Sequence, residues 1–433
     1  MSPDDLSQLD KERLWHPFTP MGDWCAPDHD PVVIAGGEGA WLRDTRGNRY
    51  LDGNSSIWTN IHGHRHPAID AAIREQLDRI AHCSGLGLTN EPAIRLADAL
   101  VGKFPPGSLT RVFYSDDGST AIECACKMAL QYWQLTGQPE RRVFAAFDRA
   151  YHGDTAGAAS LGGIGTFHGR FRRTGYETIH LADPDALDRL PDEVRNTLAA
   201  VAIEPLIQGA AGMRLWPAGL LRRLREWCDA HGILLICDEV LTGFGRTGTL
   251  FACEQEAVVP DFLALAKGLT GGYLPLAATL TTERVFEAFL GPVGERKTFY
   301  YGHSYYGNPL GCAAALASLG VFDSDQTLLH LRSNRVVLES ALNRHFGGHR
   351  HVGEIRQLGL IAGIDVVSDR ETGETFPWEA LTGARICAAA RRHGLMTRPI
   401  LDTLVFMPPL CVSAAEIEAG VAALAAGLAD VLG

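Results

Sequence analysis

The chain has 433 residues, with 39 Lys and Arg against 51 Asp and Glu, which gives a formal net charge of −12. Hydrophobic residues make up 46% and charged residues 21%, a balance that excludes an intrinsically disordered chain. The negative balance argues against nucleic-acid binding, and no run approaches the about 18 uninterrupted apolar residues of a membrane span.

The first residues and the cysteines predict a cytoplasmic protein. Residues 1–6 carry acid where a signal peptide would carry base. The ten cysteines are scattered, and none forms a C-x-x-C pair. The cysteine spacing therefore gives no support to a structural zinc site or to dithiol redox chemistry.

The N-terminal segment contains a predicted hairpin and a histidine cluster. Residues 40–52 alternate around a Gly47-Asn48 turn, which predicts two short antiparallel strands. The cluster that follows would place three imidazoles on one strand face: His62, His64 and His66. Three such ligands could hold a metal, although glycine and proline within the segment make a regular strand improbable. A metal-dependent hydrolase is therefore one alternative reading.

Between about residues 96 and 280, helical patterns alternate with short apolar runs. The predicted strands are 111–115, 142–147, 198–204, 233–238 and 262–267. Nearly continuous apolar strands that alternate with helices predict an α/β domain whose sheet is covered on both faces. Ligands of such sheets bind at the carboxyl ends of the strands, which here are Ser115, Glu204, Asp238 and Lys267.

Asp238 and Lys267 form the most informative pair, because each ends an apolar strand. A desolvated lysine has a lowered pKa and can form a Schiff base with an aldehyde. In pyridoxal phosphate enzymes a carboxylate pairs with the pyridine nitrogen. The alternative is a buried ion pair with a purely structural role.

A phosphate site is predicted where residues 115–120 lead into a helical pattern. Free N–H groups at a helix N-terminus bind anions, and Gly118 allows a close approach. Thr120 and Glu123 also fit a capping box, so an ordinary helix start is the alternative. Tyr151 follows another strand and could stack on a cofactor ring, or be a half-buried loop residue.

Residues 243–248 formally match the dinucleotide fingerprint G-x-G-x-x-G. The residues that follow make a poor helix, and the fingerprint requires a β-α-β unit, so a nicotinamide or flavin dehydrogenase is disfavoured.

The tail after about residue 328 predicts a smaller α+β domain. Residues 352–366 and 404–407 have strand character, and a capping box at Ser413–Glu416 begins a helix. Its apolar residues recur on one helical face, typical of core packing: Ile417, Val421, Leu424, Leu428 and Val431.

Residues 238–248 and 266–272 together resemble the signature of class III, fold type I pyridoxal phosphate aminotransferases. The resemblance covers nearly the whole chain. Other segments are similar to the branch of that family that converts 8-amino-7-oxononanoate to 7,8-diaminononanoate in biotin biosynthesis: residues 15–21, 51–56, 151–155, 208–213 and 398–399. The resemblance implies a mostly parallel seven-stranded sheet, a homodimer and small-molecule substrates. It also implies a division into an N-terminal segment that contributes to the small domain (1–70), a large cofactor domain (71–327) and a C-terminal small domain (328–433).

The resemblance also implies roles for individual residues. Lys267, Asp238 and Tyr151 are the expected catalytic residues, and all three would also contact the cofactor. The other expected cofactor-binding residues are Gly118, Ser119, His303 and Ser304. The expected substrate-binding residues are Phe18, Ile57, Trp58, Tyr151, Lys267, Gly302 and Arg398. In this family the loop with Gly302 reaches the other subunit's cofactor phosphate, and the arginine at the position of Arg398 holds the substrate carboxylate.

Three departures concern the amino donor. Members that use S-adenosylmethionine carry Tyr at Phe18, Trp-Trp at Ile57-Trp58 and Gly-Pro-Thr at Gly302-His303-Ser304. Members that use L-lysine are similar to this chain at these positions, so lysine is the favoured donor and S-adenosylmethionine the alternative. Another class III aminotransferase that acts on ω-amino acids or diamines, and a non-catalytic scaffold, are the further alternatives.

Overall fold

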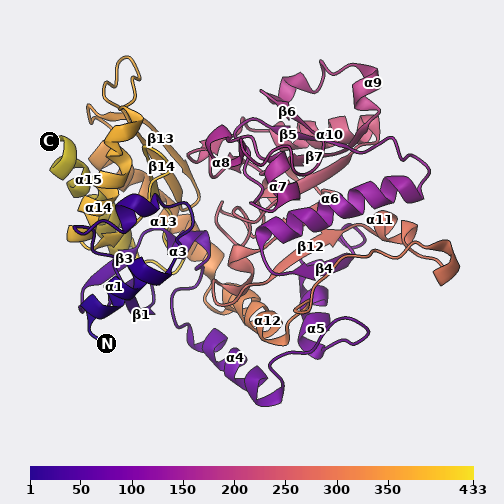
Figure 1. Cartoon of the computed structure of the whole chain (residues 1–433), viewed down its shortest axis with the longest axis horizontal. Coiled ribbons are helices and arrows are strands. Elements are labelled where there is room, and N and C mark those ends of the chain that lie inside the picture. The colour runs from indigo at the N-terminus through magenta and orange to yellow at the C-terminus, as the bar shows by residue number, and fades with distance from the viewer.

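The computed structural model describes residues 1–433, and its centre is a seven-stranded sheet of order β4-β12-β11-β10-β7-β5-β6 (Figure 1). The strands are β4 (Arg111–Ser115), β5 (Val143–Phe147), β6 (Thr178–Leu181), β7 (Leu198–Ile203), β10 (Leu234–Asp238), β11 (Phe262–Leu265) and β12 (Ala277–Thr281). Only β12 runs antiparallel to its neighbours. The five predicted strands and the mostly parallel α/β class are confirmed.

Successive residues of each strand enter two different cores. In β10, Leu234 and Ile236 pack in the cluster that contains α6 (Gly118–Leu135). Leu235 and Cys237 pack in the larger cluster that contains α10 (Leu220–His231) and α12 (Pro309–Ser324). Helices on both faces explain why the strands show no apolar–polar alternation.

A second lobe holds both chain termini (Figure 1). The predicted hairpin is formed by β2 (Trp41–Asp44) and β3 (Arg49–Asp52), which join β1 (Ile34–Glu38) in a four-stranded sheet. Its fourth strand, β15 (Leu395–Met396), pairs parallel with β3 from more than 300 residues away. The N-terminal segment and the tail therefore build one structure, and the boundaries at residues 70 and 327 remain our proposed division.

The rest of the second lobe comes from the tail. The predicted strand region 352–366 is a hairpin of β13 (Val352–Leu358) and β14 (Ile361–Val366), which pairs with β16 (Thr403–Phe406). Three helices pack on these strands and on each other: α13 (Thr327–Phe346), α14 (Thr382–Arg392) and α15 (Ala414–Leu432). The capping box that begins α15 is confirmed, and Ile417, Val421 and Leu424 are fully buried.

The chain passes between the two lobes at residues 59–66 and again at the short link between α12 and α13. Helix α12 packs on α4 (Pro67–Arg79) and α5 (Glu91–Val101), whereas α13 packs on α15. The remaining short helices are α1 (Pro3–Arg13), α2 (Met21–Trp24), α3 (Ser55–Trp58), α7 (Ala156–Leu161), α8 (Gly165–His168), α9 (Asp192–Arg195) and α11 (Glu283–Ala288), and a small ribbon is formed by β8 (Ile207–Gln208) and β9 (Arg214–Leu215).

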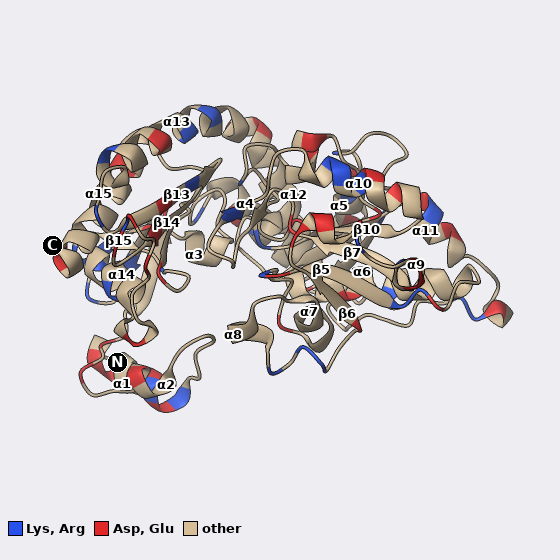
Figure 2. Ribbon diagram, turned by 90° about the horizontal axis from the view of Figure 1, so that it is seen from above, with Lys and Arg blue, Asp and Glu red and all other residues tan.

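Acidic and basic residues are interspersed along the outer helices α10 and α13 (Figure 2). None of the helices combines the length and the apolar character needed to cross a membrane.

Candidate active site

The carboxyl edge of the central sheet carries the predicted pair. Asp238 is the last residue of β10, and Lys267 follows the neighbouring strand β11. The backbone of Lys267 has φ 40°, where a short 3₁₀ turn begins. The parallel register of the two strands brings both side chains into one cavity.

That cavity has a volume of about 1330 Å³ and lies between the sheet edge and the second lobe. The predicted site residues in its lining are Phe18, Ile57, Trp58, Gly118, Ser119, Tyr151, Asp238, Lys267 and Arg398. We call Asp238, Lys267, His152 and Glu204 the floor of the cavity, and Phe18, Ile57 and Arg398 its rim. Gly302, His303 and Ser304 are not in the lining.

Asp238 is held by a histidine that the sequence analysis did not select. His152 Nδ1 lies 2.7 Å from Asp238 Oδ2, and the Val240 N–H donates to the other carboxylate oxygen at 3.1 Å. Burial alone would lower the pKa of His152, but the hydrogen bond and the charge of Asp238 raise it above its ordinary value. The pair therefore favours a protonated His152 Nδ1, whose N–H donates a hydrogen bond to the Asp238 carboxylate.

Lys267 is desolvated rather than neutralised by a direct partner. Burial is the largest influence and lowers the pKa of Lys267 to about 8, although Asp238 and Glu204 act in the opposite direction. The Lys267 Nζ lies 4.6 Å from the centre of the Trp58 ring. An amine with such a pKa can exist as a neutral nucleophile near neutral pH.

Glu204 follows β7 and is also buried in the floor. Burial raises the pKa of Glu204 to about 7, with a further contribution from Asp238. Its carboxylate accepts the Tyr151 N–H at 3.0 Å and the Gly209 N–H at 2.9 Å. Glu204 thus fixes the backbone that carries Tyr151.

The N-terminus of α6 opens onto the same cavity. The helix begins at Gly118 and is capped by Asp117, whose carboxylate accepts the Thr120 N–H at 2.9 Å. The alternative capping box at Thr120 and Glu123 is therefore wrong, because the N-cap lies three residues earlier, at Asp117. Glu123 lies inside the helix, where its carboxylate accepts the Thr155 hydroxyl at 2.7 Å.

The backbone around this helix start is packed too closely for side chains. A Cβ at Gly118 would lie 2.6 Å from Val240 Cγ1, and one at Gly153 would lie 2.2 Å from Ser119 Oγ. Ser119 Oγ accepts the Asp154 N–H at 3.0 Å, which leaves the hydroxyl proton for another acceptor. The first N–H groups of a helix have no partner within it, so this end of the cavity suits a phosphate.

Tyr151 stands in the wall between the floor and the phosphate end. Its hydroxyl donates to Asp154 Oδ2 at 2.6 Å, and its ring lies 5.4 Å from that of His168. Burial, followed by the hydrogen bond to Asp154, raises the pKa of the Tyr151 phenol. The phenol therefore stays protonated and its ring orientation is fixed.

The rim comes from distant segments. Arg398 Nη2 donates to the Phe18 carbonyl at 2.8 Å, and the Phe18 ring packs edge-on against Phe167 at 5.4 Å. Phe18 is 53% exposed and Ile57 48% exposed. The other guanidinium N–H groups of Arg398 make no hydrogen bond to the protein and can serve a ligand.

The loop with Gly302 lies outside this chain's own cavity. His303 Nδ1 is 3.4 Å from Asp116 Oδ2, and Tyr300 is 87% exposed. Its predicted contact with a neighbouring subunit's cofactor stays a prediction.

Pattern reasoning missed His152, Gly153 and Asp52, all of which line the cavity. His152 and Gly153 lie in the same segment as Tyr151, directly after a strand, and the strand-end rule could have selected them. No local pattern marks Asp52, whose position depends on pairing between β3 and β15.

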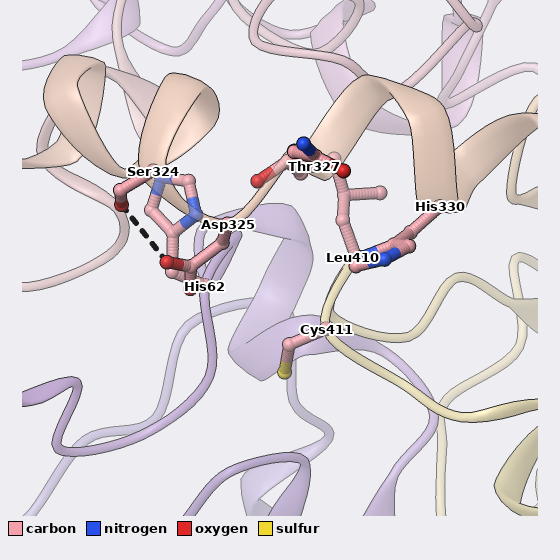
Figure 3. A pocket seen from close by; sticks show the side chains of 8 residues that line it. His62, Ser324, Asp325, Thr327, His330, Leu410 and Cys411 are labelled. Atoms are coloured by element: carbon pink, nitrogen blue, oxygen red, sulfur yellow. Dashed lines mark hydrogen bonds between the residues drawn. The ribbon is translucent and has the colours of Figure 1, made fainter.

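A second cavity of about 430 Å³ lies where α12 meets α13 (Figure 3). His62, Asp325, His330 and Cys411 line it. No three His, Cys, Asp or Glu side chains in the chain are placed to share a metal ion.

The three clustered imidazoles instead have separate partners. His62 lies 3.2 Å from Ser318 Oγ, His64 lies 3.0 Å from Asp52, and His66 lies 3.0 Å from Asp325. The hydrolase alternative therefore has no geometric support. The G-x-G-x-x-G run likewise leads into a short 3₁₀ turn at Ala252–Glu256 rather than a helix.

The fold and this site define a pyridoxal phosphate-dependent transaminase, and comparisons with known proteins agree. The family model "Aminotransferase class-III" matches residues 24–428. The adenosylmethionine-8-amino-7-oxononanoate aminotransferase of Geobacter sulfurreducens is 47% identical over 95% of each chain. The enzyme of the same name from Nitratidesulfovibrio vulgaris is 49% identical over 95% of this chain and 79% of its own.

Solved structures give the same result. The enzyme of that name from Methanocaldococcus jannaschii superposes with a TM-score of 0.96 at 39% identity over 99% of both chains. A PLP-bound amine transaminase from an uncultivated Pseudomonas species superposes with a TM-score of 0.89 at 36% identity, over 97% of this chain and 99% of its own. The chain belongs to the class III aminotransferase family.

Proposed function

We propose that this transaminase converts 8-amino-7-oxononanoate to 7,8-diaminononanoate in biotin biosynthesis, with L-lysine as the favoured amino donor and S-adenosylmethionine as the alternative. The observation that carries the proposal is one cavity that joins Lys267 and Asp238 to a phosphate-binding helix start and to Arg398. Relatives with 45–49% identity over 95–96% of the chain are named for this acceptor.

The residues present fit pyridoxal phosphate. The free N–H groups of Gly118 and Ser119 would hold its phosphate, Asp238 would meet its ring nitrogen, Tyr151 would stack on its ring, and Lys267 would bind it covalently. When bound, the cofactor supplies an electron sink for negative charge that develops on the substrate carbon.

The floor residues perform the proton work of this reaction. The Lys267 amine, with a pKa of about 8, can act as the base that takes a proton from the substrate carbon. It can then act as the acid that returns a proton within the substrate–cofactor site. The Asp238 carboxylate is held in place by the hydrogen bond from His152 and would favour a protonated ring nitrogen.

Arg398 is our candidate for the substrate carboxylate. One N–H of its guanidinium is used by the Phe18 carbonyl, which orients the remaining donors. A carboxylate held there would place the substrate's other end toward Lys267, with Phe18, Ile57 and Trp58 lining the path.

The donor preference depends on the rim. Phe18 offers no phenol hydrogen bond, and Ile57 offers no indole surface for a large aromatic group. Both properties favour lysine, whereas the relatives are named for S-adenosylmethionine.

We propose that the enzyme acts as a homodimer in the cytoplasm. Exposed apolar side chains gather beside the Gly302 loop: Leu86, Leu88, Tyr300 and Tyr305. Their segments are adjacent, because a Cβ at Gly85 would touch the Tyr306 ring. A second copy would cover them and bring Gly302, His303 and Ser304 to its partner's cavity. Sedimentation equilibrium tests the dimer, and a monomeric active enzyme would contradict it.

The proposed cytoplasmic location is supported by the cysteines. All ten are free, as is usual for proteins in reducing compartments.

A second candidate is a class III aminotransferase of amines or ω-amino acids. An (S)-enantioselective omega-transaminase from Thermomicrobium roseum superposes with a TM-score of 0.93 at 35% identity.

The test is to mix the purified yellow holoenzyme separately with lysine, S-adenosylmethionine and a panel of diamines. The compound that shifts the cofactor absorbance is the donor, and 8-amino-7-oxononanoate should then reverse the shift. Reversal only by other ketones would support the second candidate.

A further inference from the structure

Residues 55–58 form a left-handed turn in the wall of the cavity. Their φ angles are 47°, 49°, 65° and 67°, and none of the four is glycine. The left-handed conformation costs roughly 1–2 kcal/mol per L-residue, and a β-branched residue such as Ile57 is an outlier there. Four consecutive residues of this kind persist only where their surroundings hold them in place.

Asp52 makes the hydrogen bonds that hold the turn. Its Oδ1 accepts the Ser56 N–H at 2.9 Å, and its Oδ2 accepts the Ser56 hydroxyl at 2.9 Å. His64 Nε2 lies 3.0 Å from the same Oδ2. Asp52 is only 1% exposed, so these partners replace water for a buried carboxylate.

The turn fixes one side chain above the reactive lysine. The Trp58 indole N–H donates to Asn54 Oδ1 at 2.8 Å, and the Ser55 hydroxyl donates to the Met407 carbonyl at 2.6 Å. The Trp58 ring consequently lies with its centre 4.6 Å from Lys267 Nζ. An aromatic face at this distance attracts the ammonium form, while the bulk of the ring keeps water from that side of the amine.

We propose that Asp52, supported by His64, is a positioning residue for the reaction: it maintains the left-handed turn and so keeps the Trp58 face against Lys267. The inference rests on the proposed function only for the role that it gives to Lys267. Neither measurement below needs a substrate, so both stand if the substrate assignment fails.

Asp52 is not among the main influences on the pKa of Lys267. The charges that act on Lys267 are those of Asp238, Glu204 and Arg246, and burial is the largest influence. A change at Asp52 therefore reaches Lys267 by moving Trp58 and admitting water. Loss of a negative charge would lower the pKa of Lys267, whereas admission of water raises it, so the sign of the shift separates positioning from loss of charge.

The first experiment measures the pH midpoint of acetylation of Lys267 by peptide mass spectrometry, in the full-length chain freed of cofactor. Trp58→Ala should raise the midpoint by about one pH unit, because water reaches the amine. Asp52→Asn should raise it in the same direction, and the double variant should go no further than Trp58→Ala. An unchanged midpoint in Asp52→Asn, or additive shifts in the double variant, would overturn the proposal.

Asp44→Asn is the matched control. Asp44 is also a buried carboxylate of the same sheet, and it holds the neighbouring turn through the Arg46 and Asn48 N–H groups. The Asp44→Asn variant should lower the Tm without changing the pH midpoint of Lys267 acetylation. A midpoint shift equal to that of Asp52→Asn would mean that the Asp52 effect comes from general destabilisation of the sheet, and would overturn the proposal. If Asp52→Asn does not fold, Ser56→Ala removes one of the same hydrogen bonds and replaces it in the cycle.

The second experiment compares the Tm of Ile57→Gly with that of Ile57→Ala. In ordinary backbone, glycine is less stable than alanine, but at a left-handed φ the order reverses. The proposal requires the glycine variant to have the higher Tm. A higher Tm for Ile57→Ala would mean that the turn is not left-handed, and would overturn it.

Discussion

The floor and the rim of the main cavity are built in opposite ways. Asp238 ends one strand and Lys267 follows the adjacent strand of a sheet whose residues are almost entirely buried, and Asp238 is 4% exposed. Phe18, Ile57 and Arg398 come from three distant segments, and Phe18 and Ile57 both have positive φ. Under the proposed function, the core therefore fixes the groups assigned to proton transfer, while irregular backbone places the groups assigned to substrate recognition. Floor substitutions should change the rate, and rim substitutions should change binding.

Replacement of Lys267 by Ala should have the largest effect. Loss of the covalent attachment and of the proton carrier should lower turnover by on the order of 10⁴-fold or more. Turnover of the purified variant and its Tm are the measurements. The Tm should not fall, because a desolvated amine is removed. Near-normal turnover would break the assignment of the floor to chemistry.

Asp238→Asn should lower kcat by about a thousandfold, since removal of one preorganised electrostatic partner typically costs this much. Asp261→Asn is the matched control. Asp261 lies before β11 at the opposite edge of the same sheet, is 5% exposed, and accepts the Leu235 N–H at 2.9 Å. It should lower the Tm but leave kcat within a few-fold. Equal losses of kcat in the two variants would show that sheet stability, not the site, controls the rate.

Arg398→Ala tests the rim. Loss of a charged hydrogen bond to a carboxylate should raise KM for 8-amino-7-oxononanoate by roughly 10- to 100-fold, with a small effect on kcat. Arg398→Lys keeps the charge but loses the two-pronged guanidinium, so its KM should lie between those of the unchanged enzyme and Arg398→Ala. Steady-state kinetics with carboxylate and decarboxylated substrates checks this. A fall in kcat at unchanged KM would place Arg398 with the floor.

The same division explains what the sequence could predict. Asp238 and Lys267 were predictable because apolar strands end in polar residues at one edge, and this rule needs only local pattern. The region of the α6 start was predicted, but its cap was misassigned by three residues because Thr120 fits both the first and the last position of a capping box. Asp52 and the left-handed turn depend on β3–β15 pairing and on tertiary hydrogen bonds, which no local pattern encodes. The rim residues were obtained from family resemblance alone.

The smallest effect concerns the stability cost of the floor. Folding lowers the pKa of Lys267 from an ordinary 10.5 to about 8, so between these values the unfolded chain binds more protons than the folded chain. Stability of the cofactor-free chain should therefore rise with pH across this window, and the penalty is complete below it.

Lys267→Met removes that penalty. At pH 7 it should stabilise the cofactor-free chain by on the order of 2 kcal/mol, and the gain should shrink toward pH 10. Urea unfolding at several pH values measures it, with Lys103→Met on the exposed surface as the control that should show no such trend. A gain in stability that does not depend on pH would mean that Lys267 is a paired cation in the folded chain. Burial of Lys267 in the floor would then carry no desolvation penalty, and the contrast with the exposed rim would not hold for this residue.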